Sequence, residues 1–177
     1  MLRLISRSFI LAGLILTFFG FYLVYLRNSP RILTFDSKPK VVSTSSKNAP
    51  VGLEIPSLKI NLPIVAAIQK GSNWETTNIG VSYLSTTPAP GQTGNSVLYG
   101  HNWASLLRNL PEMKPGQSLF ITMKNGERQE FRVEYTAIVD PSQTYIIDST
   151  NDTRITLYTC IGFLDSKRFV VVAKPLI

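Results

Sequence analysis

The feature that most constrains the fold is a run of eighteen uncharged residues near the N-terminus, from Phe9 to Leu26. As a helix, this run is long enough to cross about 30 Å of hydrocarbon. A buried helix of a soluble protein would show a polar face, and this run shows none. A cleaved signal peptide has a shorter apolar core and small residues at its exit, whereas this run ends in Tyr25-Leu26-Arg27. We therefore expect a retained single-pass anchor over residues 9–26, with a cleaved signal peptide as the alternative.

The net charge of +7 is distributed unevenly along the chain. Residues 1–50 hold seven Lys and Arg against one Asp, so they carry +6 and the remaining residues carry +1. A nucleic-acid-binding domain concentrates Lys and Arg on its folded face. The near-neutral body therefore argues against nucleic acid as a partner. Basic residues flank the apolar run on both sides, so the charges alone do not orient the anchor.

The chain divides into four segments by composition. Residues 1–8 precede the anchor, and residues 27–50 mix Ser, Thr, Lys and Pro without a sustained period, as a linker does. Residues 51–177 are long enough for one ordinary domain with its own core. We expect this body to carry the function.

The body has the pattern of a β domain. Phe131, Val133 and Tyr135 alternate with charged residues, as in a half-buried strand, and Asn125-Gly126 separates this segment from Ser118–Met123. Asn-Gly favours a tight hairpin turn, so the two strands should pair antiparallel. Strands at this density predict an all-β fold, a closed or nearly closed barrel with one or two short helices. The other expected strands are Leu58–Ile64, Ser96–Tyr99, Arg154–Thr159 and Phe169–Ala173, and a short helix is expected over Asn102–Leu110.

The single Cys and the single His are the first candidates for chemistry. Cys160 ends a strand in which Thr156, Tyr158 and Cys160 should share one face. After seven intervening residues, Arg168 opens the next strand, and in a hairpin the last residue of one strand faces the first residue of the next. Cys160 and Arg168 should therefore lie within reach of each other. His101 also sits at a strand end.

These three residue types suit nucleophilic catalysis. A thiol with an ordinary pKa near 8.5 is only about 3% thiolate at pH 7, and a neighbouring imidazole and guanidinium would enrich the ion pair. The His could return a proton to a leaving amine, and the Arg could bind a developing oxyanion. The residues alone leave a structural alternative open, because a lone Cys on a strand is often a small core residue.

A family resemblance adds to this interpretation. The segment T-L-Y-T-C at 156–160 and the downstream Arg168 resemble the T-L-x-T-C motif and Arg of sortases, and Tyr99-Gly100-His101-Asn102 resembles their Gly-His motif. Segments 55–64, 90–97 and 139–142 also resemble sortase sequence, so the similarity covers nearly the whole body. The resemblance implies a closed eight-stranded sortase-type barrel outside the cell, with the N-terminus in the cytoplasm and the chain held in the cell membrane by one span.

The resemblance also implies a cysteine transpeptidase. Such an enzyme cleaves a Leu-Pro-x-Thr-Gly-like signal between Thr and Gly and passes the protein to an amine of a peptidoglycan precursor or a pilin lysine. By motif match, Cys160 is the nucleophile, His101 the general acid and then base, and Arg168 the substrate and oxyanion binder. Thr159 is a candidate substrate contact. Tyr145, Ile146 and Ile147 occupy the place where the family cradles Leu-Pro, with core packing as the alternative.

Two departures from relatives refine the expectation. The linker has no Asp-Pro-Trp-like segment resembling the lid of pilin-polymerising members, which favours protein anchoring or a general role over pilus assembly. Some class A members use calcium, but no Asp or Glu lies between Glu75 and Glu112. We therefore expect no metal and no cofactor.

Other classes remain as alternatives. L,D-transpeptidases place an Arg two residues after the Cys, where this chain has Gly162, and papain-like enzymes place the Cys before the His. A catalytically silent or hydrolysis-only membrane-tethered barrel that binds wall or surface-protein peptides is the alternative from another functional class.

Overall fold

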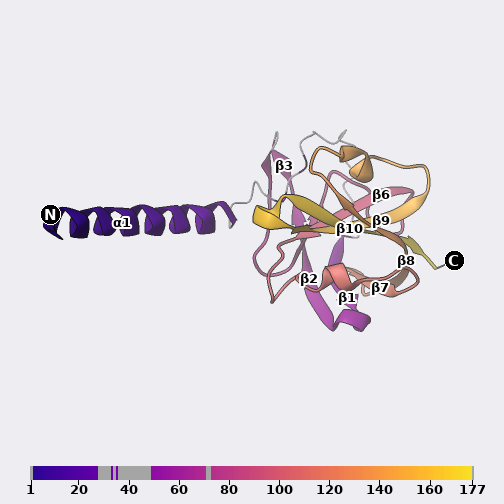
Figure 1. Cartoon of the computed structure of the whole chain (residues 1–177). Helices are drawn as coiled ribbons and strands as arrows, with labels where there is room; N and C mark the ends of the chain where they lie inside the picture. Colours follow the sequence, from indigo (N-terminus) through magenta and orange to yellow (C-terminus); the bar gives the residue numbers. More distant parts are fainter. Residues whose placement is uncertain (1, 28–32, 34, 36–48, 71–72, 177) are drawn as a thin grey trace.

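The computed structural model describes residues 2–27, 33, 35, 49–70 and 73–176. It consists of a β-barrel and a long N-terminal helix that projects away from it, with the C-terminal end of the helix nearest to the barrel (Figure 1). The helix, α1 (Leu2–Arg27), extends the predicted anchor at its N-terminal end. Its segment Arg7–Tyr25 has a mean hydropathy of 2.0 and no buried residue, so it is long and apolar enough to span a membrane.

Eight strands close into the expected barrel, in the order β1-β2-β5-β6-β9-β10-β8-β7. Two neighbouring pairs, β2 with β5 and β6 with β9, are parallel, and the other pairs are antiparallel. A separate two-stranded sheet is formed by β3 and β4. The strands are β1 (Pro50–Ile55), β2 (Ile60–Ala67), β3 (Gln69–Lys70), β4 (Asn73–Trp74), β5 (Val81–Leu84), β6 (Gly94–Gly100), β7 (Ser118–Met123), β8 (Arg128–Val139), β9 (Thr153–Ile161) and β10 (Lys167–Pro175).

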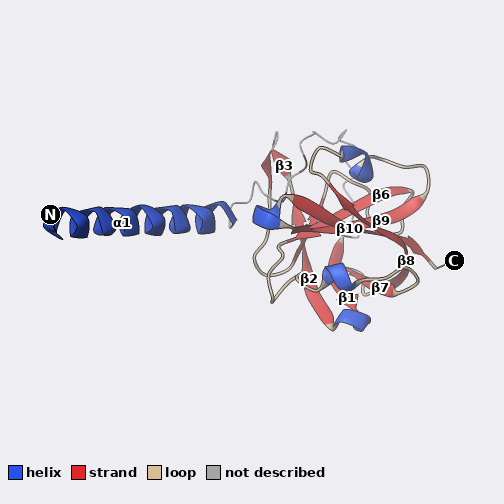
Figure 2. Cartoon of the chain, in the orientation of Figure 1, coloured by secondary structure: helices blue, strands red, loops and turns tan. Residues whose placement is uncertain are grey.

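Short helices lie at the ends of strands, on the outside of the barrel (Figure 2). All are 3₁₀ turns: η2 (Pro56–Leu58), η3 (Leu110–Glu112), η4 (Thr144–Ile147) and η5 (Phe163–Asp165). The predicted helix over 102–110 is therefore wrong. Its apolar residues Leu106, Leu107 and Leu110 are buried, but the segment forms turns, since nine residues ending before Pro111 are too few for a stable α-helix.

The predicted hairpin is confirmed, and one detail of its second strand differs. β7 pairs antiparallel with β8 around Asn125-Gly126, and Gly126 has the positive φ of 87° that the turn requires. Phe131 and Val133 are buried as expected, but Tyr135 is partly exposed. The pairing with β10 shifts between Val133 and Tyr135, which moves Tyr135 to the other face of the sheet.

Two apolar clusters stabilise the barrel. The first draws from all eight barrel strands and fills the interior, with Ile155 and Leu157 as its β9 members. The second covers the outer face of β6, β9 and β10 and includes Tyr158 and Cys160. The alternation predicted for β9 is thus confirmed, and it places the single Cys on the outer face of the barrel.

A buried amide fixes the loop after β8 on this outer face. Asn95, 2% exposed on β6, donates two hydrogen bonds of 3.1 Å to the backbone oxygens of Ile146 and Asp148. Its side-chain oxygen accepts a 2.7 Å hydrogen bond from the Thr156 hydroxyl on β9. One side chain therefore connects two neighbouring strands to η4.

Replacing Asn95 with Ala should remove three buried hydrogen bonds, at a cost of about 2–4 kcal/mol in the free energy of unfolding. The Asp148 carbonyl loses this partner outright, whereas the Thr156 hydroxyl keeps its 3.4 Å bond to the Ile146 oxygen. For the full chain in mild detergent we expect a fall in Tm of about 5–15 °C, measured by near-UV circular dichroism. The matched control is Asn151→Ala, because Asn151 is exposed in the neighbouring loop. Equal melting of the two variants would contradict the role assigned to this amide.

Candidate active site

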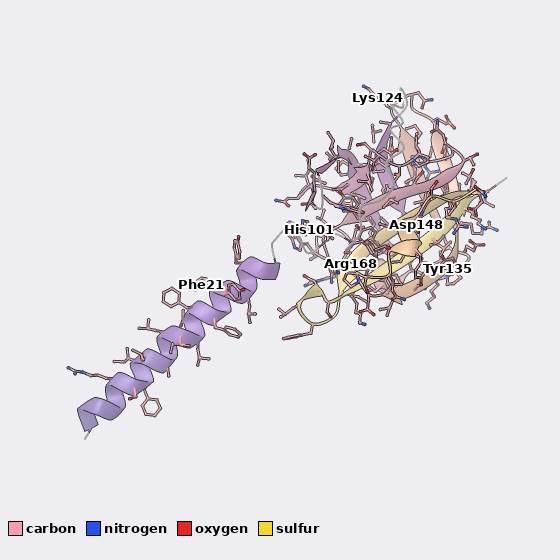
Figure 3. The ribbon with its side chains drawn as sticks, turned by 90° about the horizontal axis from the view of Figure 1, so that it is seen from above. Phe21, His101, Lys124, Tyr135, Asp148 and Arg168 are labelled. Carbon is pink, nitrogen blue, oxygen red and sulfur yellow. The ribbon has the colours of Figure 1, made fainter. Side chains whose placement is uncertain are left out.

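Three neighbouring strands bring Cys160, His101 and Arg168 to one face of the barrel. In the β9–β10 hairpin Arg168 is registered directly against Cys160, as the hairpin argument predicted. In the parallel β6–β9 pair Gly100 is registered against Thr159, so the next residues, His101 and Cys160, follow side by side. Cys160 therefore lies between the other two. Figure 3 shows His101 and Arg168 at the end of the barrel that faces α1.

The guanidinium of Arg168 is held by backbone carbonyls of its own hairpin. Its Nη1 donates hydrogen bonds of 2.8 Å to the oxygen of Asp165 and 3.1 Å to that of Lys167. The residue is 3% exposed, so its permanent charge lies in a region of low dielectric beside the thiol. A charge fixed in this way can stabilise an anion that forms on the neighbouring strand.

The imidazole of His101 stacks on the indole of Trp103, with ring centroids 4.4 Å apart and planes 10° from parallel. His101 is 6% exposed, and burial lowers its pKa below the ordinary value of 6.5. The ring is therefore neutral at pH 7 in this conformation and can accept a proton.

Burial likewise raises the pKa of the Cys160 thiol well above its ordinary value, to about 12. The charge of Arg168 lowers this pKa and that of Asp165 raises it, but desolvation is the larger effect. The sequence argument predicted an enriched thiolate–imidazolium pair. In this closed conformation the thiol and the imidazole are instead both neutral, because each is cut off from water.

Two residues of the linker help to close the site. Leu33 and Phe35 are 1% and 2% exposed and belong to the outer cluster. The Tyr158 hydroxyl donates a 2.9 Å hydrogen bond to the oxygen of Leu33, and its ring meets that of Phe35 edge to face at 5.0 Å. The guanidinium carbon of Arg168 lies 6.0 Å from the centre of the Phe35 ring. These two residues therefore pack on the barrel, beyond the spacer role expected of the segment 27–50.

The four expected substrate contacts have different environments. Thr159 is fully buried and donates a 2.8 Å hydrogen bond to the oxygen of Gly100, which ties β9 to β6 next to Cys160 and His101. Ile146 and Ile147 are buried in the outer cluster, which is what the core-packing alternative predicts. Tyr145 is 62% exposed, so it is the one of the four that is open to a ligand.

Sequence reasoning missed the aromatic side chains that lie under the site. Tyr99 and Tyr158 stack at 5.6 Å across β6 and β9, and Trp74 packs edge to face against Tyr99 at 5.3 Å. The strand alternation that placed Tyr158 beside Cys160 was the available signal for one member. Trp74 gave no such signal because it comes from the short sheet β3–β4.

Trp74 also lines a cavity of about 380 Å³ on the outer side of β2 and β5, together with residues such as Val65, Glu75 and Ser82. The cavity lies one strand away from His101, because Ser82 is registered against Tyr99. None of the three catalytic candidates lines it.

Within the described part of the chain, no group of three or more His, Cys, Asp or Glu side chains could hold a metal ion. Independence of metal remains a prediction that activity must test.

Comparison with known proteins identifies the family. The sortase domain model matches residues 53–176. Sortase A of Listeria monocytogenes is 29% identical over 163 residues, which cover 84% of this chain and 71% of that protein. Its crystal structure superimposes with a TM-score of 0.59 at 27% identity and covers 73% of this chain and 88% of that one.

A lid mutant of sortase A from Corynebacterium diphtheriae superimposes with a TM-score of 0.63 at 26% identity, covering 75% of this chain and 73% of that one. The domain match takes in the whole barrel except the start of β1, and with it all three catalytic candidates. The chain therefore belongs to the sortases, a family of membrane-anchored cysteine transpeptidases that attach proteins to the cell wall.

Proposed function

We propose that this sortase cleaves a Leu-Pro-x-Thr-Gly-like signal between Thr and Gly and transfers the upstream protein to an amine. The register that sets Cys160 between His101 and Arg168 is the observation that carries the proposal. The chain would be held in the cell membrane by α1, with residues 1–8 in the cytoplasm and the barrel outside. Its partners would be secreted proteins that bear the signal and an amine from a peptidoglycan precursor or a pilin lysine.

The first half of the reaction forms a thioester. The proton of the Cys160 thiol passes to His101, and the sulfur adds to the Thr carbonyl carbon to give a tetrahedral oxyanion. The guanidinium of Arg168 stabilises this oxyanion. When the C–N bond breaks, imidazolium His101 protonates the departing Gly amine, and the Thr carbonyl remains bonded to sulfur.

The second half releases the product. The acceptor amine attacks the thioester carbonyl, and neutral His101 removes a proton from the attacking nitrogen. The C–S bond then breaks and a new amide remains, while the sulfur recovers its proton from His101. At the end of each half His101 is again neutral and the sulfur of Cys160 carries no charge, as in the closed site.

Substrate must displace the linker residues that cover the site. Leu33 and Phe35 pack on Tyr158 and beside Arg168, on the same face as Cys160. A peptide that reaches the thiol would take their place. We propose that Tyr145, exposed beside the buried pair Ile146 and Ile147, contacts the peptide, while Thr159 supports the site through its bond to Gly100.

The assay incubates the full chain in mild detergent with signal peptides and several amines and identifies products by mass spectrometry. Transfer products support the proposal. Hydrolysis without transfer would favour a peptidase, and a lack of any product across a broad peptide library would favour the silent binding barrel.

In this assay Cys160→Ala should abolish both cleavage and transfer, and His101→Ala and Arg168→Ala should each lower kcat/KM by about two to four orders of magnitude. Arg168→Lys keeps the charge but not the geometry of the guanidinium, so it should restore little activity. The control is Arg154→Ala, since Arg154 pairs with Asp152 at the far end of β9. Full turnover by Cys160→Ala would refute the mechanism.

Removing the ring that covers the site should make the thiol more reactive. At pH 8 a thiol of pKa about 12 is about one part in 10,000 thiolate, so Cys160 should react slowly with iodoacetamide. In Phe35→Ala water reaches the thiol, its pKa falls, and alkylation should accelerate at least about tenfold. Phe120→Ala on β7 is the control, and equal rates in the two variants would contradict the covering role of Phe35.

Calcium should not affect the reaction. We expect that millimolar CaCl₂ or a chelator changes the transfer rate less than about twofold, because the described carboxylates form no cluster of ligands. The transfer rate is measured with CaCl₂, with the chelator and with neither. A large gain on adding Ca²⁺ would overturn this expectation.

A further inference from the structure

The turn between β9 and β10 exposes two large apolar side chains. Phe163 is 83% exposed and Leu164 is 44% exposed, in contrast to the buried residues of the strands on either side. The turn spans only Gly162–Ser166, and the two strands that it connects carry Cys160 and Arg168. Neither side chain belongs to the clusters that stabilise the barrel. These two side chains therefore do not stabilise the barrel core, and adjacent exposed apolar residues of this kind can mark an interaction surface.

The backbone of this turn holds the two side chains outward by an unfavourable conformation. Leu164 and Asp165 have positive φ angles of 52° and 58°, which cost an L-residue about 1–3 kcal/mol each. Gly162, with φ of 84°, supplies the first bend. The Asp165 oxygen in turn accepts the hydrogen bond from Arg168 Nη1. The shape of the turn is thus tied to the guanidinium of the catalytic face.

The same turn lies against the membrane helix. η5 contacts α1, and in Figure 1 and Figure 2 the turn lies beside the C-terminal end of that helix. Tyr22 and Tyr25 are exposed near this end, and tyrosines are enriched where a helix leaves the hydrocarbon core. A turn that contacts this end of α1 lies at the level of the lipid headgroups.

The charged side chains around the turn are compatible with a position at the level of the lipid headgroups. Lys167 forms a half-exposed ion pair with Asp140 at 2.7 Å, Arg168 is buried, and Asp165 is the charged side chain within the turn itself. Headgroups and water solvate such polar groups, while Phe and Leu side chains enter the boundary with the acyl chains. Two side chains offer far less area than the roughly 800 Å² per partner of a stable protein interface. A lipid surface fits the turn better than a second protein.

We propose that the turn Gly162–Ser166 is a second membrane contact, which inserts Phe163 and Leu164 into the headgroup region of the bilayer that α1 spans. The partner that Phe163 and Leu164 contact is lipid. Insertion fixes the catalytic face at the membrane surface, because Cys160 and Arg168 lie directly beside the turn. The proposal rests on α1 being a membrane span and does not depend on the transpeptidase chemistry.

The chain has a single Cys, so replacing it leaves no native thiol to compete for a label. In a Cys160→Ala background, Ser166→Cys provides one thiol in the turn and leaves both apolar side chains in place. The full-length protein is labelled with a polarity-sensitive fluorophore and reconstituted in vesicles of phosphatidylcholine and phosphatidylglycerol, with and without lipids that carry a quencher near the headgroup. The matched control is Lys124→Cys in the β7–β8 turn, which lies away from α1 (Figure 3).

We expect the label at position 166 to be quenched at least about threefold more than the label at position 124. Adding Phe163→Ser and Leu164→Ser should reduce quenching at position 166 to the level of the control. Equal quenching at the two positions would overturn the proposal. Strong quenching at position 166 that survives the double serine change would also overturn it, because the turn would then lie near the membrane without inserting. Neither readout requires activity, so this test and that of the proposed function fail independently.

Discussion

The pairing of β9 with a different strand on each side is the constraint on which the rest of the structure depends. Its antiparallel hairpin with β10 sets Arg168 against Cys160, and its parallel pairing with β6 brings in His101. The hydrogen bond from Thr159 to Gly100 and the stack of Tyr99 on Tyr158 hold the parallel pair together. The face that carries the three catalytic candidates is thus defined by backbone register, with packed aromatic rings beneath it.

What the sequence predicted well depended on local geometry. Asn125-Gly126 determines its hairpin through the backbone of two residues, and the short segment between Cys160 and Arg168 leaves little choice of register. The alternation along β9 distinguished interior from outer residues because successive side chains of a strand point to opposite faces. His101 is different, because its pairing with β9 spans 59 residues and no local rule sets it. The resemblance to sortase motifs supplied that link.

What the sequence did not predict depends on tertiary contacts. The segment 102–110 has helical spacing, but its leucines pack into the barrel as turns. Leu33 and Phe35 lie in a polar segment with no period, and contacts with residues distant in sequence, such as Tyr158, make them part of the outer cluster. The neutral state of the Cys160 and His101 side chains could not be predicted either, since it follows from the burial of both in the folded barrel.

The central claim is that Cys160 carries the acyl group. It is tested most directly by mixing the full chain with a Leu-Pro-x-Thr-Gly peptide, quenching in acid and measuring the intact mass of the protein. The account predicts a mass increase equal to the Leu-Pro-x-Thr acyl group, located on Cys160 by peptide mapping and released by hydroxylamine. Cleavage of the peptide with no adduct, or with the adduct on another residue, would contradict it.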